Sequence, residues 1–212
     1  DEASVLALTE EKVFETIKGY IGDYEQIPPM FSAIKIGGEK LYNLARRGMV
    51  IERPARHCKI IDITVTKMYL PRVDLHVTCS KGTYVRTLCS DIGNDLGVGG
   101  CMEKLIRTKV ERFHVDESIT LKQIEAYRDN GTLEAYITPV DEMLDTYSKC
   151  VVSENAGKLV YNGNIFTSGN TFLKMNHEDG QTVRVYTYDG KFIGLYKFYK
   201  EKQIYKPIKM FL

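Results

Sequence analysis

Hydrophobic residues first recur at helical spacing near the N-terminus. Val13, Ile17 and Ile21 share one face of a segment that Thr9 precedes, and Thr is a common N-cap residue. The pattern predicts an amphipathic helix that begins after Thr9 and ends near Gly22.

Two segments then alternate with the two-residue period of a β-strand. Residues 59–70 are rich in β-branched side chains, and residues 73–79 place alternate hydrophobic side chains on one face, so the pattern predicts a hairpin. After Gly82 the period becomes helical, which predicts a strand, a tight turn and a helix ending near Gly97. Shorter predicted elements are an extended loop at 26–29, a helix at 40–47, a strand at 105–113, a helix capped by Thr120 and a helical piece at Pro139.

Strands dominate the pattern towards the C-terminus. After one helix with Ser153 as its N-cap, residues 183–188 and 191–198 flank Asp189–Gly190, a dipeptide typical of the type I′ turn of a β-hairpin. Residues 204–211 form the next predicted strand. These elements predict a second, small, β-rich domain.

Composition places the chain among globular proteins. Its 212 residues are 43% hydrophobic and 27% charged, enough for one large domain or for a larger and a smaller one. Apolar stretches span only a few residues, whereas a membrane helix needs about 20, so neither a membrane span nor a secretory signal is expected. The five widely spaced cysteines predict reduced thiols of a cytosolic protein. The four histidines form no pair with metal-ligand spacing, so no metal is expected.

The formal net charge of +1 hides an uneven distribution. Residues 30–59 carry seven Lys and Arg against two Glu, and residues 197–209 carry five Lys against one Glu. Such blocks form basic patches that suit a polyanion, although lysines also protect exposed sheet edges.

Two segments carry candidate chemistry. The turn at Lys81–Gly82 releases Tyr84 and Arg86 at the start of a predicted helix, and an aromatic ring beside a fixed cation suits a nucleotide. Spacing alone favours the simpler explanation, a basic turn with Tyr84 packed on the sheet. The proline loop at 26–29 leads into a basic, glycine-containing segment that would serve phosphate contact or a solvated face equally well.

Longer motifs decide between these alternatives. The run from Gln26 reads Q-I-P-P-M-F-S-A-I-K-I-G-G-E-K-L-Y-N-L-A-R-R-G, the run from Cys79 reads C-S-K-G-T-Y-V-R-T-L-C-S-D-I-G, and L-G-V-G-G-C follows from Leu96. Together they resemble the bacterial tRNA pseudouridine-55 synthases, the TruB family, and the resemblance extends along the whole chain. The segments G-K-F-I-G-L and K-P-I-K-M-F near the C-terminus resemble the PUA-type RNA-binding domain of that family.

The resemblance implies an isomerase that converts one uridine in the T-loop of tRNA to pseudouridine. The base is flipped out of the RNA stack, detached from its ribose, turned and rejoined through carbon, with no cofactor and no metal. Tyr84 is expected to lie against the flipped base, Arg86 to hold the catalytic carboxylate by a bidentate pair, and Leu105 to form a wall of the pocket. The basic residues expected to bind the substrate are Lys35, Arg46 and Lys81.

One part of the family pattern is not found. The family's catalytic Asp lies in a G-x-L-D-type motif of its N-terminal part, with a Lys-Pro motif and a second pocket tyrosine, and Asp1 does not match that residue. The chain starts without Met and is expected to begin just past that part, so that alone it would be inactive. Asp91 and Asp95 are expected to be solvated on the predicted helix.

The sequence therefore predicts an α+β protein in which residues 1–148 are part of a mixed-sheet pseudouridine synthase catalytic domain and residues 149–212 form a PUA-like domain. The expected partner is the T-arm of tRNA, in the cytoplasm, with a monomeric full-length enzyme. The alternative is an RNA-binding module without catalysis, which an in-frame upstream G-x-L-D motif in the gene would argue against.

Overall fold

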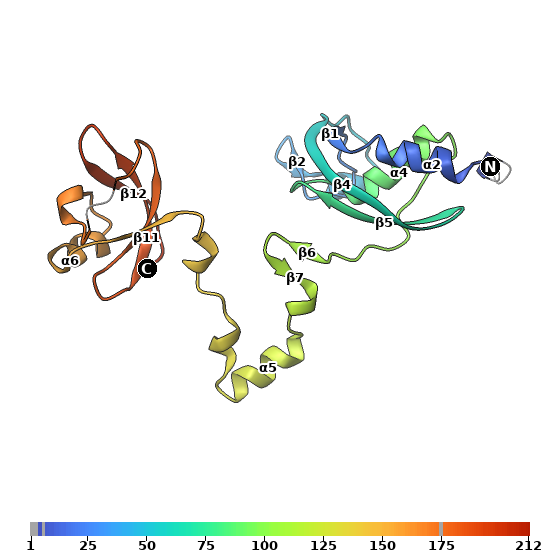
Figure 1. The fold of residues 1–212 in the computed structure, drawn as a ribbon. Coiled ribbons are helices and arrows are strands. Elements are labelled where there is room, and N and C mark those ends of the chain that lie inside the picture. Colours follow the sequence, from blue (N-terminus) through green and yellow to red (C-terminus); the bar gives the residue numbers. More distant parts are fainter. Residues whose placement is uncertain (1–3, 6, 174–175) are drawn as a thin grey trace. The chain divides into compact units, whose positions relative to one another are not determined.

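The chain folds into two compact units with separate cores, residues 1–116 and residues 117–212 (Figure 1). The computed structural model describes residues 4–5, 7–173 and 176–212. Both units combine helices with β-sheet, which confirms the predicted α+β class. The predicted division after residue 148 falls inside the second compact unit and stays a prediction.

The first unit is built on a three-stranded antiparallel sheet of order β1-β4-β5, with strands β1 (Gly22–Gln26), β4 (Arg56–Tyr69) and β5 (Arg72–Cys79). The hairpin of β4 and β5 confirms the prediction. The polar sequence of β1 gives no strand signal, and the helix predicted to end near Gly22 ends at Lys18 instead, so that Gly22 begins the strand. It forms through its pairing with β4, in which Gln26 lies opposite Arg56.

Helices α2 (Glu10–Lys18) and α4 (Val85–Asp95) contribute to the core of this unit (Figure 1). The Thr9 hydroxyl accepts a hydrogen bond from the Lys12 N–H at 3.3 Å, which confirms the predicted N-cap. The buried side chains of this core are Val13, Ile17, Ile60, Ile63, Leu88 and Ile92.

Glycines shape the end of α4. Gly97 has a φ of 76° and ends the helix as predicted, and the chain then passes so close to the helix that a Cβ on Gly93 would lie 2.2 Å from the Gly100 nitrogen. The Gly97–Gly100 segment is thus a helix-terminating turn that packs against its own helix.

The segment between β1 and β4 forms a small hairpin and a helix. Strands β2 (Lys35–Ile36) and β3 (Glu39–Lys40) pair with each other and lead directly into α3 (Leu41–Arg46), whose Leu41 and Leu44 are buried. This helix confirms the short helix predicted at 40–47.

The long strand predicted at 105–113 is wrong. Residues 101–108 have no regular structure, and only β6 (Lys109–Val110) and β7 (Phe113–His114) form, paired with each other. The side chains from Leu105 to Phe113 are exposed on both faces, so the alternation there does not mark a buried sheet face. Beyond them come the 3-10 turns η1 (Val115–Glu117), η2 (Leu133–Tyr136) and η3 (Glu142–Leu144), and helix α5 (Leu121–Asp129), which begins at the predicted Thr120 cap.

The second unit contains a five-stranded mixed sheet of order β8-β10-β11-β12-β9. Its strands are β8 (Ser148–Val151), β9 (Phe166–Thr167), β10 (Thr182–Tyr186), β11 (Phe192–Tyr199) and β12 (Ile204–Met210). The short helical elements are η4 (Glu154–Ala156), α6 (Gly157–Tyr161) and η5 (Ser168–Asn170). The strands predicted between residues 183 and 211 are confirmed.

The turn between β10 and β11 differs from the predicted type I′. Gly190 has a φ of 88°, but Asp189 does not adopt the positive φ that type I′ also requires. The Gly190 N–H instead donates to the Thr187 carbonyl at 3.0 Å, which closes a longer turn, and the Lys191 N–H donates to the Thr187 hydroxyl. The Thr187 hydroxyl therefore accepts the Lys191 N–H, a bond that a main-chain carbonyl would accept in a two-residue hairpin.

Candidate functional site

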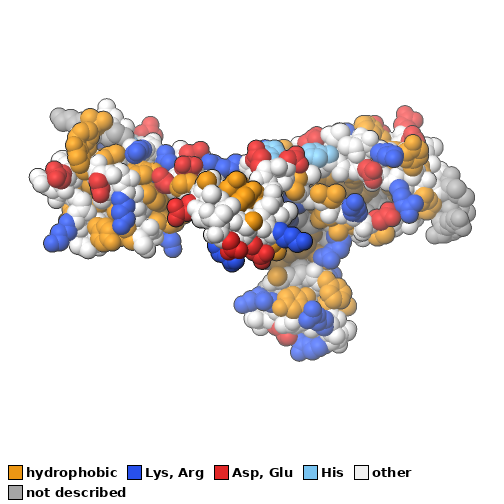
Figure 2. All heavy atoms as spheres, turned by 90° about the horizontal axis from the view of Figure 1, so that it is seen from below, with side chains coloured by type: hydrophobic (Ala, Val, Ile, Leu, Met, Phe, Trp, Pro, Cys, Tyr) orange, Lys and Arg blue, Asp and Glu red, His pale blue; other side chains and the backbone are white. Residues whose placement is uncertain are grey.

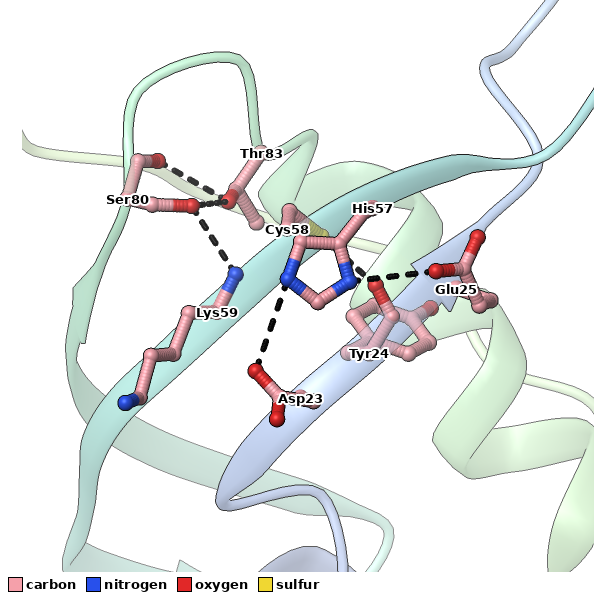
Figure 3. Close-up of polar contacts among 8 residues, drawn as sticks. All are labelled: Asp23, Tyr24, Glu25, His57, Cys58, Lys59, Ser80 and Thr83. Atoms are coloured by element: carbon pink, nitrogen blue, oxygen red, sulfur yellow. Dashed lines mark hydrogen bonds and ion pairs between the residues drawn. The ribbon is translucent and has the colours of Figure 1, made fainter.

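The connection from β5 to α4 is fixed to the sheet by side-chain hydrogen bonds. The Ser80 hydroxyl accepts from the Lys59 N–H at 2.9 Å, and the Thr83 hydroxyl donates to the Ser80 carbonyl at 2.9 Å (Figure 3). Gly82 supplies the left-handed conformation of the turn, with a φ of 87°. The turn therefore starts α4 at a defined place next to β4.

Tyr84 is the N-cap of α4 and keeps an extended backbone, with φ −94° and ψ 98°. The side chain of Gln26, at the end of β1, bonds both main-chain groups of Tyr84. Its Oε1 accepts from the Tyr84 N–H at 2.7 Å, and its Nε2 donates to the Tyr84 carbonyl at 3.1 Å. Extended backbone at Tyr84 is the condition under which Tyr84 and Arg86 leave the chain in a similar direction.

Arg86 is exposed in the first turn of α4. Its Nη2 donates to the carbonyl of Phe31 at 2.9 Å, which ties the helix to the loop that follows Gln26. A guanidinium has five N–H donors in a planar fork, so this bond leaves others for a carboxylate. The geometry agrees with the predicted task of Arg86, which stays a prediction.

A small cavity of about 100 Å³ lies beside Tyr84. Its lining residues are Gln26, Pro28, Arg56, His57, Cys58, Lys81, Gly82 and Tyr84. Among them, Arg56 and Lys81 carry positive charge and His57 contributes an imidazole ring. The His57 ring also faces two carboxylates of β1, with Nδ1 at 3.1 Å from Glu25 and Nε2 at 3.5 Å from Asp23 (Figure 3). The cavity thus has two cationic side chains, Arg56 and Lys81, and an aromatic ring in its lining, a combination that suits an anionic group next to a planar one.

Comparison with known proteins identifies the family. The N-terminal domain of the TruB family pseudouridylate synthases matches residues 1–85, and the C-terminal domain of tRNA pseudouridylate synthase B matches residues 86–145. A protein named tRNA pseudouridine synthase B from Lachnoclostridium phytofermentans is 43% identical over 206 residues, covering 92% of this chain and 67% of that protein. The chain belongs to the TruB family. The protein of the same name from Clostridium tetani is 41% identical over 209 residues, covering 99% of this chain and 69% of that one.

Solved structures share the fold of this TruB family chain. A chain in the crystal structure of a Cbf5-Nop10-Gar1 complex matches with a TM-score of 0.67 and 23% identity over 97% of this chain. A chain in the structure of an H/ACA RNP bound to a substrate RNA matches with the same TM-score and 21% identity. The TruB family chain spans 63% and 62% of the lengths of those two chains and about two thirds of the curated relatives. No helix in the described part of the chain is long and apolar enough to cross a membrane.

The structure brings only some of the predicted site residues of this TruB family member together. Lys81 and Tyr84 line the cavity, and Arg86 is two residues from Tyr84. Leu105 is 53% exposed in the segment without regular structure and is not among the lining residues of this cavity. Lys35 is exposed in β2, and Arg46 ends α3 with its guanidinium 5.3 Å from the centre of the Tyr42 ring, so both lie outside the cavity lining.

The expectation that Asp91 is solvated on α4 is wrong. The Tyr24 hydroxyl donates to the carboxylate of Asp91, which is partly buried, and the Tyr20 hydroxyl donates to that of Asp95 at 2.5 Å. Burial and the bonded carboxylates raise the pKa of both tyrosines, with burial the larger cause. These pairs join β1 and the residues just before it to α4, because the aspartates lie on the side of the helix that faces the tyrosines.

The basic block of the second unit lies on β11 and β12. Lys197 and Lys206 occupy directly opposite positions of the antiparallel pair, and their ammonium groups lie 6.0 Å and 5.1 Å from the centre of the Tyr199 ring. Like charges directly opposite each other destabilise a sheet, so this pair has an electrostatic cost. Figure 2 shows the basic side chains of one face of the molecule interspersed with acidic and hydrophobic ones.

Sequence reasoning missed Gln26 and His57 as parts of the site. Gln26 stands in the first motif, but a buried polar side chain gives no hydrophobic signal, and its partner is 58 residues away. The position of His57 opposite Glu25 depends on β1, the strand that the pattern did not show.

Proposed function

We propose that this chain is part of a pseudouridine synthase that isomerises uridine 55 in the T-loop of tRNA. The observation that carries the proposal is the presentation of Tyr84 and Arg86 together at the start of α4 in a member of the TruB family. The two relatives named above carry the name tRNA pseudouridine synthase B, which supports the same substrate. We place the enzyme in the cytoplasm and expect it to act as a monomer.

All bonds that break and form in the reaction belong to the uridine itself. The bond from the ribose to the ring nitrogen breaks, the base turns, and a bond from the ribose to ring carbon 5 forms. The hydrogen on that carbon leaves as a proton, and the freed nitrogen gains one. Since no electrons are gained or lost, the isomerisation requires no redox cofactor.

In this reaction Tyr84 stacks against the flipped base, and Arg86 holds the carboxylate that assists the bond exchange at the ribose. Arginine suits this task because its planar fork matches a carboxylate and stays charged at every physiological pH. Leu105 is proposed to approach the pocket when RNA is bound. Lys81, Lys35 and Arg46 are proposed to contact the RNA backbone.

We further propose that residues 1–212 by themselves bind T-arm RNA without isomerising it. The chemistry needs a carboxylate facing Arg86, and the carboxylates of Asp91 and Asp95 accept bonds from Tyr24 and Tyr20 instead. The family's G-x-L-D-type motif is the proposed source of the reacting Asp.

Tritium release tests the activity, because tritium on carbon 5 of uridine 55 enters water when that carbon bonds to the ribose. The full-length gene product should release it from a T-arm stem-loop, and residues 1–212 alone should not. Arg86→Ala should lower kcat by roughly 10²- to 10³-fold, as expected for removing one electrostatic contact at a reacting centre. The exposed, ion-paired Arg128 gives the matched control, Arg128→Ala, which should keep the parent rate. A parent rate in Arg86→Ala would contradict the role of Arg86.

Salt dependence tests the basic residues. Binding of a T-arm stem-loop to residues 1–212 should weaken steeply as salt increases, because lysines and arginines displace counterions from phosphates. Lys197→Ala combined with Lys206→Ala should reduce the slope of log K against log salt by about 1 to 2. An unchanged slope would remove β11 and β12 from the RNA contact. Binding without tritium release by the full-length product would favour the RNA-binding module instead of the enzyme.

A further inference from the structure

Gln26 has two features that are unusual for a glutamine. The residue is only 2% exposed, and both the oxygen and the nitrogen of its side-chain amide form hydrogen bonds with the main chain of one distant residue, Tyr84. Gln26 is the last residue of β1, and the pairing of β1 with β4 places it opposite Arg56. The same contact therefore joins the edge strand of the sheet to the N-cap of α4.

The two bonds fix the backbone of Tyr84 from both sides. The Tyr84 carbonyl also accepts from the N–H groups of Thr87 at 2.9 Å and Leu88 at 3.1 Å, which are the first bonds of α4. The Tyr84 N–H donates to the Gln26 side chain. A rotation of the Tyr84 backbone would leave a partly buried N–H without its hydrogen-bond partner, which is unfavourable.

The side-chain chemistry required at residue 26 is narrow. One side chain must accept from an N–H and donate to a carbonyl, and it must reach both from the end of β1. Asparagine is one methylene shorter, and an ionised glutamate only accepts, so its charge would face the Tyr84 carbonyl. A protonated glutamate has the same shape as glutamine and again carries one donor and one acceptor.

We propose that Gln26 is a positioning residue that holds Tyr84, and through α4 also Arg86, in the geometry required for the isomerisation. This inference rests on the proposed function and adds to it a residue that acts through Tyr84. Gln26 sits in the wall of the cavity, but its acceptor and one donor are committed to Tyr84. It therefore affects the turnover of bound RNA more than the binding of RNA.

Substitution of Gln26 in the full-length gene product separates these effects. Gln26→Ala should lower kcat for tritium release by roughly 10- to 100-fold, the cost of misplacing a reacting group by about 1 Å, while KM changes less than about threefold. Gln123 offers the matched control, because its amide oxygen is also bonded to a main-chain N–H, that of Thr120 at 2.8 Å. Gln123→Ala removes that helix cap and lowers stability but should keep kcat at the parent value.

Gln26→Glu supplies a readout that a merely structural role would not change. Burial, the Tyr84 carbonyl and the neighbouring carboxylate of Glu25 favour the protonated form of the new carboxyl. The nitrogen groups around the cavity, on Arg56, His57 and Lys81, favour its ionised form. Below the resulting pKa the side chain replaces glutamine, so the activity of Gln26→Glu relative to the parent should increase as the pH falls. The activity of Gln26→Ala relative to the parent should be constant with pH.

Three outcomes would overturn the inference while the parent enzyme is active: a kcat of Gln26→Ala within twofold of the parent, an equal loss of kcat in Gln123→Ala, or a pH-independent ratio for Gln26→Glu. An inactive parent would instead refute the proposed function. Amide hydrogen exchange at Tyr84 then decides on Gln26 without turnover, because the exchange should be at least tenfold faster in Gln26→Ala. An unchanged exchange rate would overturn the inference.

Discussion

A methyl group at Gly93 provides the sharpest test of how α4 ends. The Cβ of Gly93→Ala would lie 2.2 Å from the Gly100 nitrogen and 2.2 Å from the Gly99 carbonyl carbon. Carbon atoms in ordinary contact are about 3.5–4.0 Å apart, so the loop would have to move by more than about 1 Å. The atoms are backbone and cannot rotate away. Forced packing of this kind costs about 1–3 kcal/mol and sometimes more.

The higher helix propensity of alanine acts in the opposite direction and favours the folded state. Alanine is favoured over glycine inside a helix by about 1 kcal/mol, so Gly93→Ala would be stabilising if α4 ended in open space. Because the clash involves two backbone groups at once, we expect it to exceed this gain and to lower the free energy of unfolding of the first unit by about 2 kcal/mol.

Hydrogen exchange of the α4 amides measures this free energy for the first unit alone. Gly157→Ala is the matched control, since Gly157 is also helical and the nearest atom to its added Cβ is 4.0 Å away. It should change the stability of the second unit by between zero and about +1 kcal/mol. A Gly93→Ala protein as stable as the parent would refute the close approach of residues 99 and 100 to α4.

Two further predictions concern stability. Tyr24→Phe should lower the stability of the first unit by about 1–3 kcal/mol, because it removes a hydrogen bond to the partly buried Asp91 carboxylate. Tyr69 is exposed, so Tyr69→Phe should stay within about 0.5 kcal/mol of the parent. Urea unfolding of both variants measures the difference. Burial lowers the pKa of His177, whose Nδ1 lies 2.8 Å from the Tyr205 hydroxyl, so the unfolded chain binds its proton more readily. The second unit should therefore lose stability as the pH falls through the region below about 6.5, and His177→Gln should flatten this dependence; unfolding measured against pH would contradict this if the two curves were parallel.

The sequence predicted elements whose signal is local. Helices α2 and α5 could be placed because Thr9 and Thr120 precede amphipathic segments, and the β4–β5 hairpin because its hydrophobic alternation is long. Alternation alone failed between residues 105 and 113, since a strand also needs a neighbouring strand to pair with. The dipeptide Asp-Gly predicts the wrong type for the turn after Thr187, because it gives no sign of the bond from the Lys191 N–H to the Thr187 hydroxyl.

Only the parts of the candidate site that are close together in the sequence could be predicted. The spacing of Tyr84 and Arg86 places them on the same side if residue 84 is extended, and the structure meets this condition. What enforces the condition is a residue in a strand of polar sequence, and Gly22–Gln26 becomes a strand only by pairing with β4. Long-range contacts of this kind leave no periodic pattern, so Gln26 and His57 could be recognised only in the folded molecule.

The polar residues around β1 explain why α4 is held so firmly beside it. Tyr20 bonds Asp95, Tyr24 bonds Asp91, and Gln26 bonds Tyr84. These three residues, which run from Tyr20, just before β1, to the end of β1, therefore contact α4 from its last turn back to its N-cap. The hydrophobic core under α4 fixes its distance from the sheet, but apolar packing is not directional. Directional hydrogen bonds at both ends also prevent the helix from sliding or turning about its axis. The placement of Arg86 therefore depends on residues that a hydrophobic pattern cannot reveal.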